Sequence, residues 1–231
     1  MPTARDLSRI AAVIPAYQEE KYVADVARRT RLQLEHVLVV DDGSNDNTAA
    51  EARAAGVEVL VHAQNRGKGE SIKSGLRYWM ERGMDYILLL DADGQHLPEE
   101  IPRFLDAVAH GGQQILLGTR MSDTKDMPLL RRLVNRYMSN RISAACGQAI
   151  PDTQCGFRML HRDVVPEILG GSQRFDYETE MLIRTSRKGC RIGAVPISTV
   201  YSDEVSSINP VRDTIRFFQL MHRYRKRGGD G

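Results

Sequence analysis

Residues 86–95 read YILLLDADGQ, an apolar run that ends directly in two aspartates, Asp91 and Asp93. A short apolar run of this kind predicts a strand buried on both faces, as in a parallel sheet covered by helices. Alternate side chains of an extended segment lie on one side, so Asp91 and Asp93 are expected to present their carboxylates together. Open α/β sheets bind ligands at the carboxyl ends of their strands. This stretch therefore predicts both a fold class and the position of a site within it.

Two carboxylates this close repel each other unless a cation lies between them. Mg²⁺ and Mn²⁺ suit such a pair, because they are hard cations that take oxygen ligands and often bind substrate phosphates as well. An acidic turn that caps a helix starting near Pro98 is the alternative, and the motif alone leaves both interpretations open.

Short apolar runs recur along the first half of the chain, and they predict strands at residues 11–14, 37–40, 57–61, 86–90 and 115–117. Helix-like patterns follow the first four runs, at residues 19–31, 48–55, 70–82 and 98–110. This alternation predicts an α/β fold with a mostly parallel central sheet and helices on both faces. The second half is expected to form helices at 127–147, 176–188 and 211–227 and strands at 154–161 and 191–200.

The first two strands also end in polar residues, as the strand before Asp91 does. Pro15, Tyr17 and Glu19 end the first strand, and Asp42 ends the second. At a shared rim, Pro15 and Tyr17 can pack against a base, while Glu19 and Asp42 can accept hydrogen bonds from a base or a ribose. Each residue taken singly also suits a helix cap, but the joint pattern favours a ligand site.

The chain has 231 residues, 42% of them apolar and 27% charged, with a formal net charge of +2. These values are typical of a soluble globular protein, and neither the charge nor any motif indicates nucleic-acid binding. The three cysteines, Cys146, Cys155 and Cys190, form no C-x-x-C pair, so we expect reduced thiols in a cytoplasmic protein. No apolar run approaches the roughly 20 residues that span a bilayer, so no transmembrane segment is expected.

Five segments occur in the order and spacing of family 2 glycosyltransferases with the GT-A nucleotide-sugar fold: VIPAYQEE (13–20), VVDDGSNDNT (39–48), NRGKGESIKSGL (65–76), DADGQHLPE (91–99) and GTR (118–120). Three later segments resemble the dolichol-phosphate mannosyltransferase and polyprenyl-phosphate glycosyltransferase branch: DTQCGFRML (152–160), FDYETEMLIRTSRKGCRIGAVPI (175–197) and SSINPVRDTIRF (206–217). The resemblance implies one glycosyltransferase domain at 1–227, with a nucleotide-sugar and metal-binding half at 11–120, an acceptor-binding half at 121–227 and a disordered tail at 228–231.

The resemblance also implies roles for individual residues. Nucleotide contacts fall on Pro15, Tyr17, Glu19 and Asp42. Metal and diphosphate contacts fall on Asp91, Asp93 and Gln95, with Ala92 between the aspartates lining the donor site and Mg²⁺ or Mn²⁺ as the cofactor. Arg120 is expected to face phosphate, and Asp93, Arg120 and Glu178 are the expected catalytic residues.

The implied reaction is an inverting transfer of a sugar from GDP-mannose or a UDP-sugar to a polyprenyl or dolichyl phosphate. The branch often carries a Lys in a late G-x-S-K block, but residues 204–207 here read EVSS, so Arg212 is expected to supply the charge and the donor stays open. A hydroxyl acceptor would need a general base, for which the cluster Asp176, Glu178 and Glu180 is the candidate; these acids also suit the start of a helix. A phosphate acceptor needs no base.

The loop at residues 65–69 is basic and rich in glycine but lacks the spacing of a P-loop. Gly67 and Gly69 are expected to serve a turn, and Lys68 to contact the donor. His96, beside the acidic motif, is the one histidine expected near the site.

Residues 127–147 and 211–227 combine apolar and basic residues, which predicts a protein peripheral to the inner face of a membrane, with a separate membrane partner protein possible. Arg132 and Arg136, four residues apart on one helix face, are expected to hold a lipid phosphate together with Arg120. The alternative is that both basic stretches are solvated faces of core helices.

Two rival functions stay open from the sequence. One is transfer to a hydroxyl of a glycan or small molecule. The other is a non-catalytic module that binds nucleotide-sugar or membrane. A sugar-nucleotide pyrophosphorylase is disfavoured, because the segment after the first strand is acidic rather than basic and rich in glycine.

Overall fold

The computed structural model describes residues 7–120, 129–170 and 177–198. In these residues seven strands form one sheet, in the spatial order β3-β2-β1-β4-β6-β5-β7. The strands are β1 Ile10–Ala16, β2 His36–Asp41, β3 Glu58–Val61, β4 Tyr86–Leu89, β5 Ile115–Thr119, β6 Arg158–His161 and β7 Ile192–Pro196. The α-helices are α1 Val23–Arg31, α2 Thr48–Ala54, α3 Lys68–Glu81, α4 Ile101–His110, α5 Leu129–Cys146, α6 Val165–Leu169 and α7 Tyr177–Arg187.

The sheet is parallel except at β6, which runs antiparallel to both neighbours, β4 and β5. β1 pairs in parallel with β2 and β4, and β5 pairs in parallel with β7. The register places Ala16 beside Asp41, so β1 and β2 end at the same level. The prediction of a mostly parallel sheet is confirmed, and so is a shared rim for the polar strand ends.

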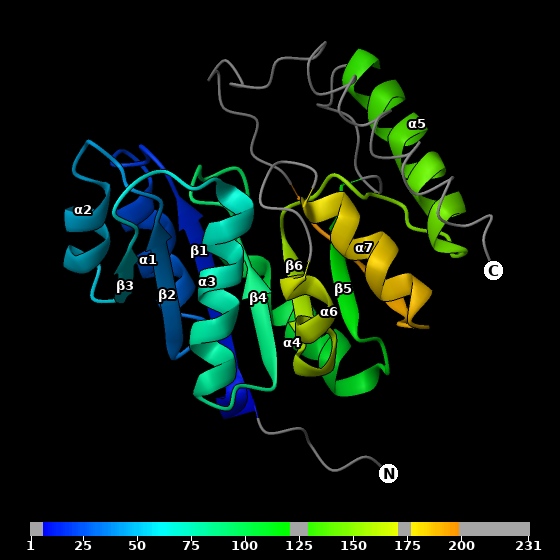
Figure 1. The fold of residues 1–231 in the computed structure, drawn as a ribbon, viewed down its shortest axis with the longest axis horizontal. Coiled ribbons are helices and arrows are strands. Elements are labelled where there is room, and N and C mark those ends of the chain that lie inside the picture. Colours follow the sequence, from blue (N-terminus) through cyan, green and yellow to red (C-terminus); the bar gives the residue numbers. More distant parts are fainter. Residues whose placement is uncertain (1–6, 121–128, 171–176, 199–231) are drawn as a thin grey trace.

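Helices cover both faces of the sheet (Figure 1), as the sequence predicted. One core cluster joins α1, α2 and α4 to the sheet, through residues such as Val26, Ala52 and Phe104. The second joins α3, α6 and α7, through residues such as Leu76, Ile168 and Leu182. Because the central strands contribute to both clusters, they had to be apolar on both faces, which explains their unbroken apolar runs.

Helix α3 packs unusually closely on β1. A Cβ on Gly75 would lie 2.4 Å from a methyl group of Val13, so only glycine fits there. One turn further on, the indole nitrogen of Trp79 donates a 3.0 Å hydrogen bond to the carbonyl of Ala12. These two contacts fix the helix whose first residue, Lys68, enters the site described below.

The structure shortens several predicted elements. The first helix starts at Val23 rather than at residue 19, and the backbone carbonyl of Glu19 accepts the amides of Tyr22 and Val23 in the turn that precedes it. The strand predicted at 154–161 begins only at Arg158, since residues 152–157 form a loop at the site. Helix α6 was not predicted. The expected helix at 211–227 lies outside the described residues.

Within the described part of the chain, none of the helices combines the length and apolarity that crossing a membrane would require.

Candidate functional site

The acidic motif lies where the sequence predicted it, in the loop that follows β4. Asp91 is bound from one side by Lys68, whose Nζ lies 2.7 Å from Oδ1. On the other side is the loop before β6, where a Cβ on Gly156 would lie 2.4 Å from Asp91 Oδ2. Gly156 is therefore required by the close approach of this loop to the aspartate.

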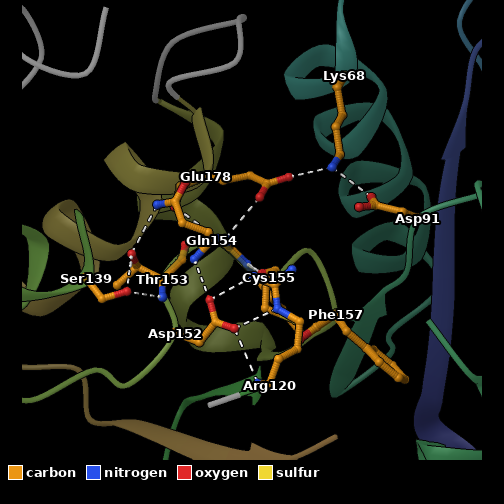
Figure 2. A network of polar contacts seen from close by, with 11 residues as sticks. Lys68, Asp91, Arg120, Ser139, Asp152, Thr153, Gln154, Cys155, Phe157 and Glu178 are labelled. Atoms are coloured by element: carbon orange, nitrogen blue, oxygen red, sulfur yellow. Dashed lines mark hydrogen bonds and ion pairs between the residues drawn. The ribbon is translucent and has the colours of Figure 1, made fainter. Parts of the chain in front are cut away.

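Lys68 also reaches Glu178 in the first turn of α7, with 2.7 Å between Nζ and Oε1 (Figure 2). The other oxygen of Glu178, Oε2, accepts a 3.0 Å bond from Arg158. Arg158 is fully buried and also donates to the carbonyls of Cys155, Thr153 and Glu178. Ion pairs thus connect α3, the end of β4, the start of β6 and α7 in one network.

The two aspartates differ in charge environment. Burial alone would raise the pKa of Asp91, but Lys68, with other positive neighbours, holds that pKa below its ordinary value. The pKa of Asp93 is raised by burial and by the negative charge of Asp91. Lys68 keeps its proton firmly, because Asp91 and Glu178 raise its pKa although burial opposes them.

The donor chemistry of the motif fits a hard divalent cation. Asp91 and Asp93 are close enough for one charge to disfavour ionisation of the other, and a cation between them would remove that cost. The backbone amide of Gln95 donates to Asp93 Oδ1 at 2.9 Å, which orients that carboxylate. In the described residues no group of three His, Cys, Asp or Glu converges, so further ligands would come from Gln95, water or a phosphate.

His96 lies near the motif, as predicted. It is buried, its ring is tilted against Phe157 at 5.6 Å between centroids, and its Nδ1 has no hydrogen-bond partner among the described residues. Burial lowers the pKa of His96 to about 4. The imidazole is therefore neutral near pH 7.

Asp42 is buried and bound to the loop that precedes α3. Its Oδ1 accepts the amide of Arg66 at 3.0 Å and contacts His62 Nδ1 at 2.7 Å, while Oδ2 accepts the amide of Gly67 at 2.7 Å. Asp42 therefore fixes the backbone from which Lys68 extends. This anchoring role was not predicted, and the expected contact with a base or ribose stays a prediction.

The other expected nucleotide residues lie at the same rim. Pro15 is buried near the end of β1, and Tyr17, just beyond it, is exposed. Glu19 is half-buried and its amide donates to Thr48 Oγ1 at 2.8 Å, which ties the β1 loop to α2. The exposed ring of Tyr17 is available to a ligand, whereas Pro15 is buried and belongs to the packed end of β1.

Arg120 differs most from its expected environment. It is only 6% exposed, and Asp152 binds it through two hydrogen bonds, Nε to Oδ2 at 2.7 Å and Nη2 to Oδ1 at 2.9 Å. Its charge is therefore balanced inside the protein, and contact with a phosphate stays a prediction. Asp152 and Arg158 were missed as individual residues; the segment DTQCGFRML, noted only as a family motif, was the signal.

Arg132 and Arg136 are exposed on α5, next to the exposed Leu133 and Tyr137. Helix α5 lies beside α7 (Figure 1) and is tied to the site loop by Ser139, whose Oγ accepts the amide of Thr153 at 3.1 Å. No contact joins the two arginines to the aspartates among the described residues. Arg212 lies outside these residues.

Comparison with known proteins identifies the family. The model of glycosyl transferase family 2 matches residues 11–169. An undecaprenyl-phosphate mannosyltransferase from Micrococcus luteus is 33% identical over 83% of this chain and 84% of its own. A UDP-N-acetylglucosamine–dolichyl-phosphate N-acetylglucosaminyltransferase from Methanococcus voltae is 29% identical over 84% of this chain and 86% of its own.

Among solved structures, glucosyl-3-phosphoglycerate synthase from Mycobacterium tuberculosis in complex with UDP superposes with a TM-score of 0.75. The superposition covers 98% of this chain and 84% of that one, at 19% identity. This likeness establishes a GT-A fold. The family match over residues 11–169 shows that the chain is a glycosyltransferase and belongs to glycosyl transferase family 2.

Proposed function

We propose that this chain transfers a sugar from a nucleoside-diphosphate donor to a polyprenyl phosphate, in a metal-dependent reaction that inverts the anomeric centre. The state of Glu178 carries the proposal. Its two carboxylate oxygens are bound by two different cations, Lys68 and Arg158. One of the three acids considered as a general base is thus engaged in ion pairs.

This observation supports a phosphate acceptor. A hydroxyl acceptor must lose a proton to a base within hydrogen-bond reach, whereas a lipid phosphate is already ionised near pH 7. Relatives from Micrococcus luteus and Methanococcus voltae are named for undecaprenyl-phosphate and dolichyl-phosphate acceptors, which supports the same choice.

The donor site would lie at the rim formed by β1, β2 and β4. Tyr17 would pack against the base, and Asp91, Asp93 and Gln95 would hold Mg²⁺ or Mn²⁺. When bound, this cation would neutralise charge that develops on the leaving diphosphate. Structures of the Mycobacterium tuberculosis synthase with Mn²⁺ and UDP or with Mg²⁺ and UDP support a divalent cation here.

The acceptor site would lie toward α5. Arg132 and Arg136 are exposed, and a planar guanidinium can bind a phosphate through paired hydrogen bonds. Leu133 and Tyr137 are large, exposed apolar neighbours suited to a lipid chain. The same surface would place the protein peripherally on the cytoplasmic face of a membrane.

The test is sugar transfer from UDP- and GDP-sugars with Mn²⁺ to undecaprenyl phosphate, compared with hydroxyl acceptors. Arg132→Ala and Arg136→Ala should each lower transfer to the lipid about tenfold or more, since a hydrogen bond to a charged group contributes about 1.5–3 kcal/mol. Donor binding should change little.

Arg141 provides a matched control, because it is exposed on the same helix and lies about half a turn around from Arg132. Arg141→Ala should transfer normally. Normal transfer by both Arg132→Ala and Arg136→Ala, or a wild type that uses only hydroxyl acceptors, would contradict the proposal.

A further inference from the structure

Lys68 occupies a position that the expected role of a donor contact does not explain. Its ammonium group lies 2.7 Å from Asp91 Oδ1 and 2.7 Å from Glu178 Oε1, between the acidic motif and α7 (Figure 2). It therefore already supplies Asp91 with the positive charge that the paired carboxylates require.

The backbone of Lys68 is anchored, whereas the end of its flexible side chain is held by ion pairs with Asp91 and Glu178. Asp42 accepts the amides of Arg66 and Gly67 and thereby anchors the chain immediately before Lys68. The Lys68 side chain is 36% exposed, and rotation about the bonds of its four-carbon stem would let the ammonium group change partner without movement of α3.

A cation at Asp91 would meet this ammonium charge directly. Lys68 takes Oδ1, and the backbone at Gly156 packs against Oδ2, so no oxygen of Asp91 is free of a neighbour. A divalent cation arriving alone would therefore have to displace Lys68 or lie beside it, and like charges at this distance repel. A cation that arrives with a diphosphate brings the negative charge that offsets this repulsion and gives the ammonium group a new partner.

We propose that Lys68 acts as an internal counter-cation that makes metal binding at Asp91 and Asp93 conditional on the donor diphosphate. Without metal, Lys68 is paired with Asp91 and competes with the cation for this carboxylate. When the donor binds, its diphosphate would become the new ionic partner of Lys68, and Asp91 would then be free to bind the cation. Lys68 is in this sense a positioning residue as well as a donor contact. This inference rests on the proposed function, because it presumes a nucleoside-diphosphate donor with a divalent cation.

The test is Mn²⁺ binding, measured by the electron paramagnetic resonance signal of free Mn²⁺, without nucleotide and with UDP or GDP. Wild type should bind Mn²⁺ weakly alone and at least tenfold more tightly with the preferred nucleotide. Lys68→Met should bind Mn²⁺ alone at least tenfold more tightly than wild type, because the ammonium group then neither occupies Asp91 Oδ1 nor repels the cation. The enhancement by nucleotide should shrink correspondingly.

Two variants separate this effect from general damage. Lys68→Arg keeps the positive charge and should bind Mn²⁺ alone as weakly as wild type does. Lys188→Met removes the same charge from the end of α7, where Lys188 pairs with Glu167 at 3.6 Å, and should leave Mn²⁺ binding unchanged. A variant that merely loosens the fold would weaken the affinity, so the expected gain cannot come from misfolding.

The outcomes distinguish this inference from the proposed function. If Mn²⁺ and nucleotide bind together but Lys68→Met binds Mn²⁺ alone no more tightly than Lys188→Met does, the role of Lys68 is overturned and the metal-dependent function stands. If wild type binds no Mn²⁺ even with UDP or GDP, both proposals are overturned.

Discussion

At the scale of single residues, Asp91 and Asp93 are chemically identical and yet differ in environment. Asp91 is held in a direct ion pair with Lys68, which keeps its pKa below the ordinary value. Asp93 has its pKa raised, by burial and by the charge of Asp91. An ionised Asp93 therefore costs folding free energy near pH 7 when no cation is bound.

Replacing Asp93 by Asn should accordingly abolish sugar transfer and metal-dependent nucleotide binding without loss of stability. The amide removes a carboxylate that is disfavoured in the folded state, so the melting temperature in EDTA should be equal to or above that of wild type. Calorimetric nucleotide binding with Mn²⁺ and thermal unfolding in EDTA measure the two effects. Asp106→Asn, at an exposed position of α4, is the control, and near-native turnover of Asp93→Asn would refute the metal assignment.

The buried pair of Arg120 and Asp152 gives a second prediction at this scale. The two side chains are 7% and 0% exposed, so removal of either partner leaves a buried charge without its ion-pair partner. Arg120→Met or Asp152→Asn alone should lower the free energy of unfolding by about 3–5 kcal/mol. The double variant should lose less free energy of unfolding than the two single variants lose in sum. A double-mutant cycle by urea denaturation measures this, and strictly additive losses would contradict a direct coupling.

At the scale of elements, α3 links the core to the site. Its Gly75 and Trp79 seat it against β1, and its first residue is Lys68. A displacement of α3 in the core is therefore transmitted to the position of Lys68. The α3 helix thus has to satisfy packing at one end and charge geometry at the other.

Gly75→Ala should be destabilising although alanine is the better helix former. The new methyl group would lie 2.4 Å from Val13, and such overpacking costs about 1–3 kcal/mol, more than the gain of about 1 kcal/mol in helix propensity. Urea denaturation should show the loss. Glu81→Ala, at an exposed position near the end of α3, should be nearly neutral, and a stabilised Gly75→Ala would show that the contact relaxes freely.

At the scale of the whole molecule, β6 joins the two halves of the chain. It lies between β4 and β5, and the loop before it carries Asp152, Cys155 and Gly156. Cys155 is fully buried in this junction, and burial raises the pKa of its thiol to about 12. Its thiol therefore reports on opening of the junction.

Cys155 should react with a thiol reagent at pH 8 only at the rate of unfolding, while the half-buried Cys146 and Cys190 react sooner. Because the folded pKa is raised above the ordinary value of 9.0, the contribution of this thiol to stability is present below pH 9 and is lost as the pH rises toward 12. Labelling kinetics in increasing urea, with Cys155→Ala to identify the slow phase, measure the reactivity of the Cys155 thiol. Rapid labelling of Cys155 in native protein would exclude a closed junction.

The sequence by itself determined most of the elements and the position of the rim. Unbroken apolar runs predicted strands buried on both faces, and the position of Asp91 and Asp93 directly after one of them placed the acidic motif correctly. These predictions succeeded because strand burial and side-chain alternation are local properties, readable within a few residues.

The tertiary structure alone decided how the charges pair. Lys68, Asp91 and Glu178 come from three separate segments, and Arg120 meets Asp152 only because β6 enters the sheet beside β5. The order of strands in a sheet cannot be predicted from a local sequence pattern, since that order depends on which apolar faces pack together. The sequence therefore predicts which side chains reach the rim. Topology and packing decide which partners these side chains have, and with them the charge balance of the site.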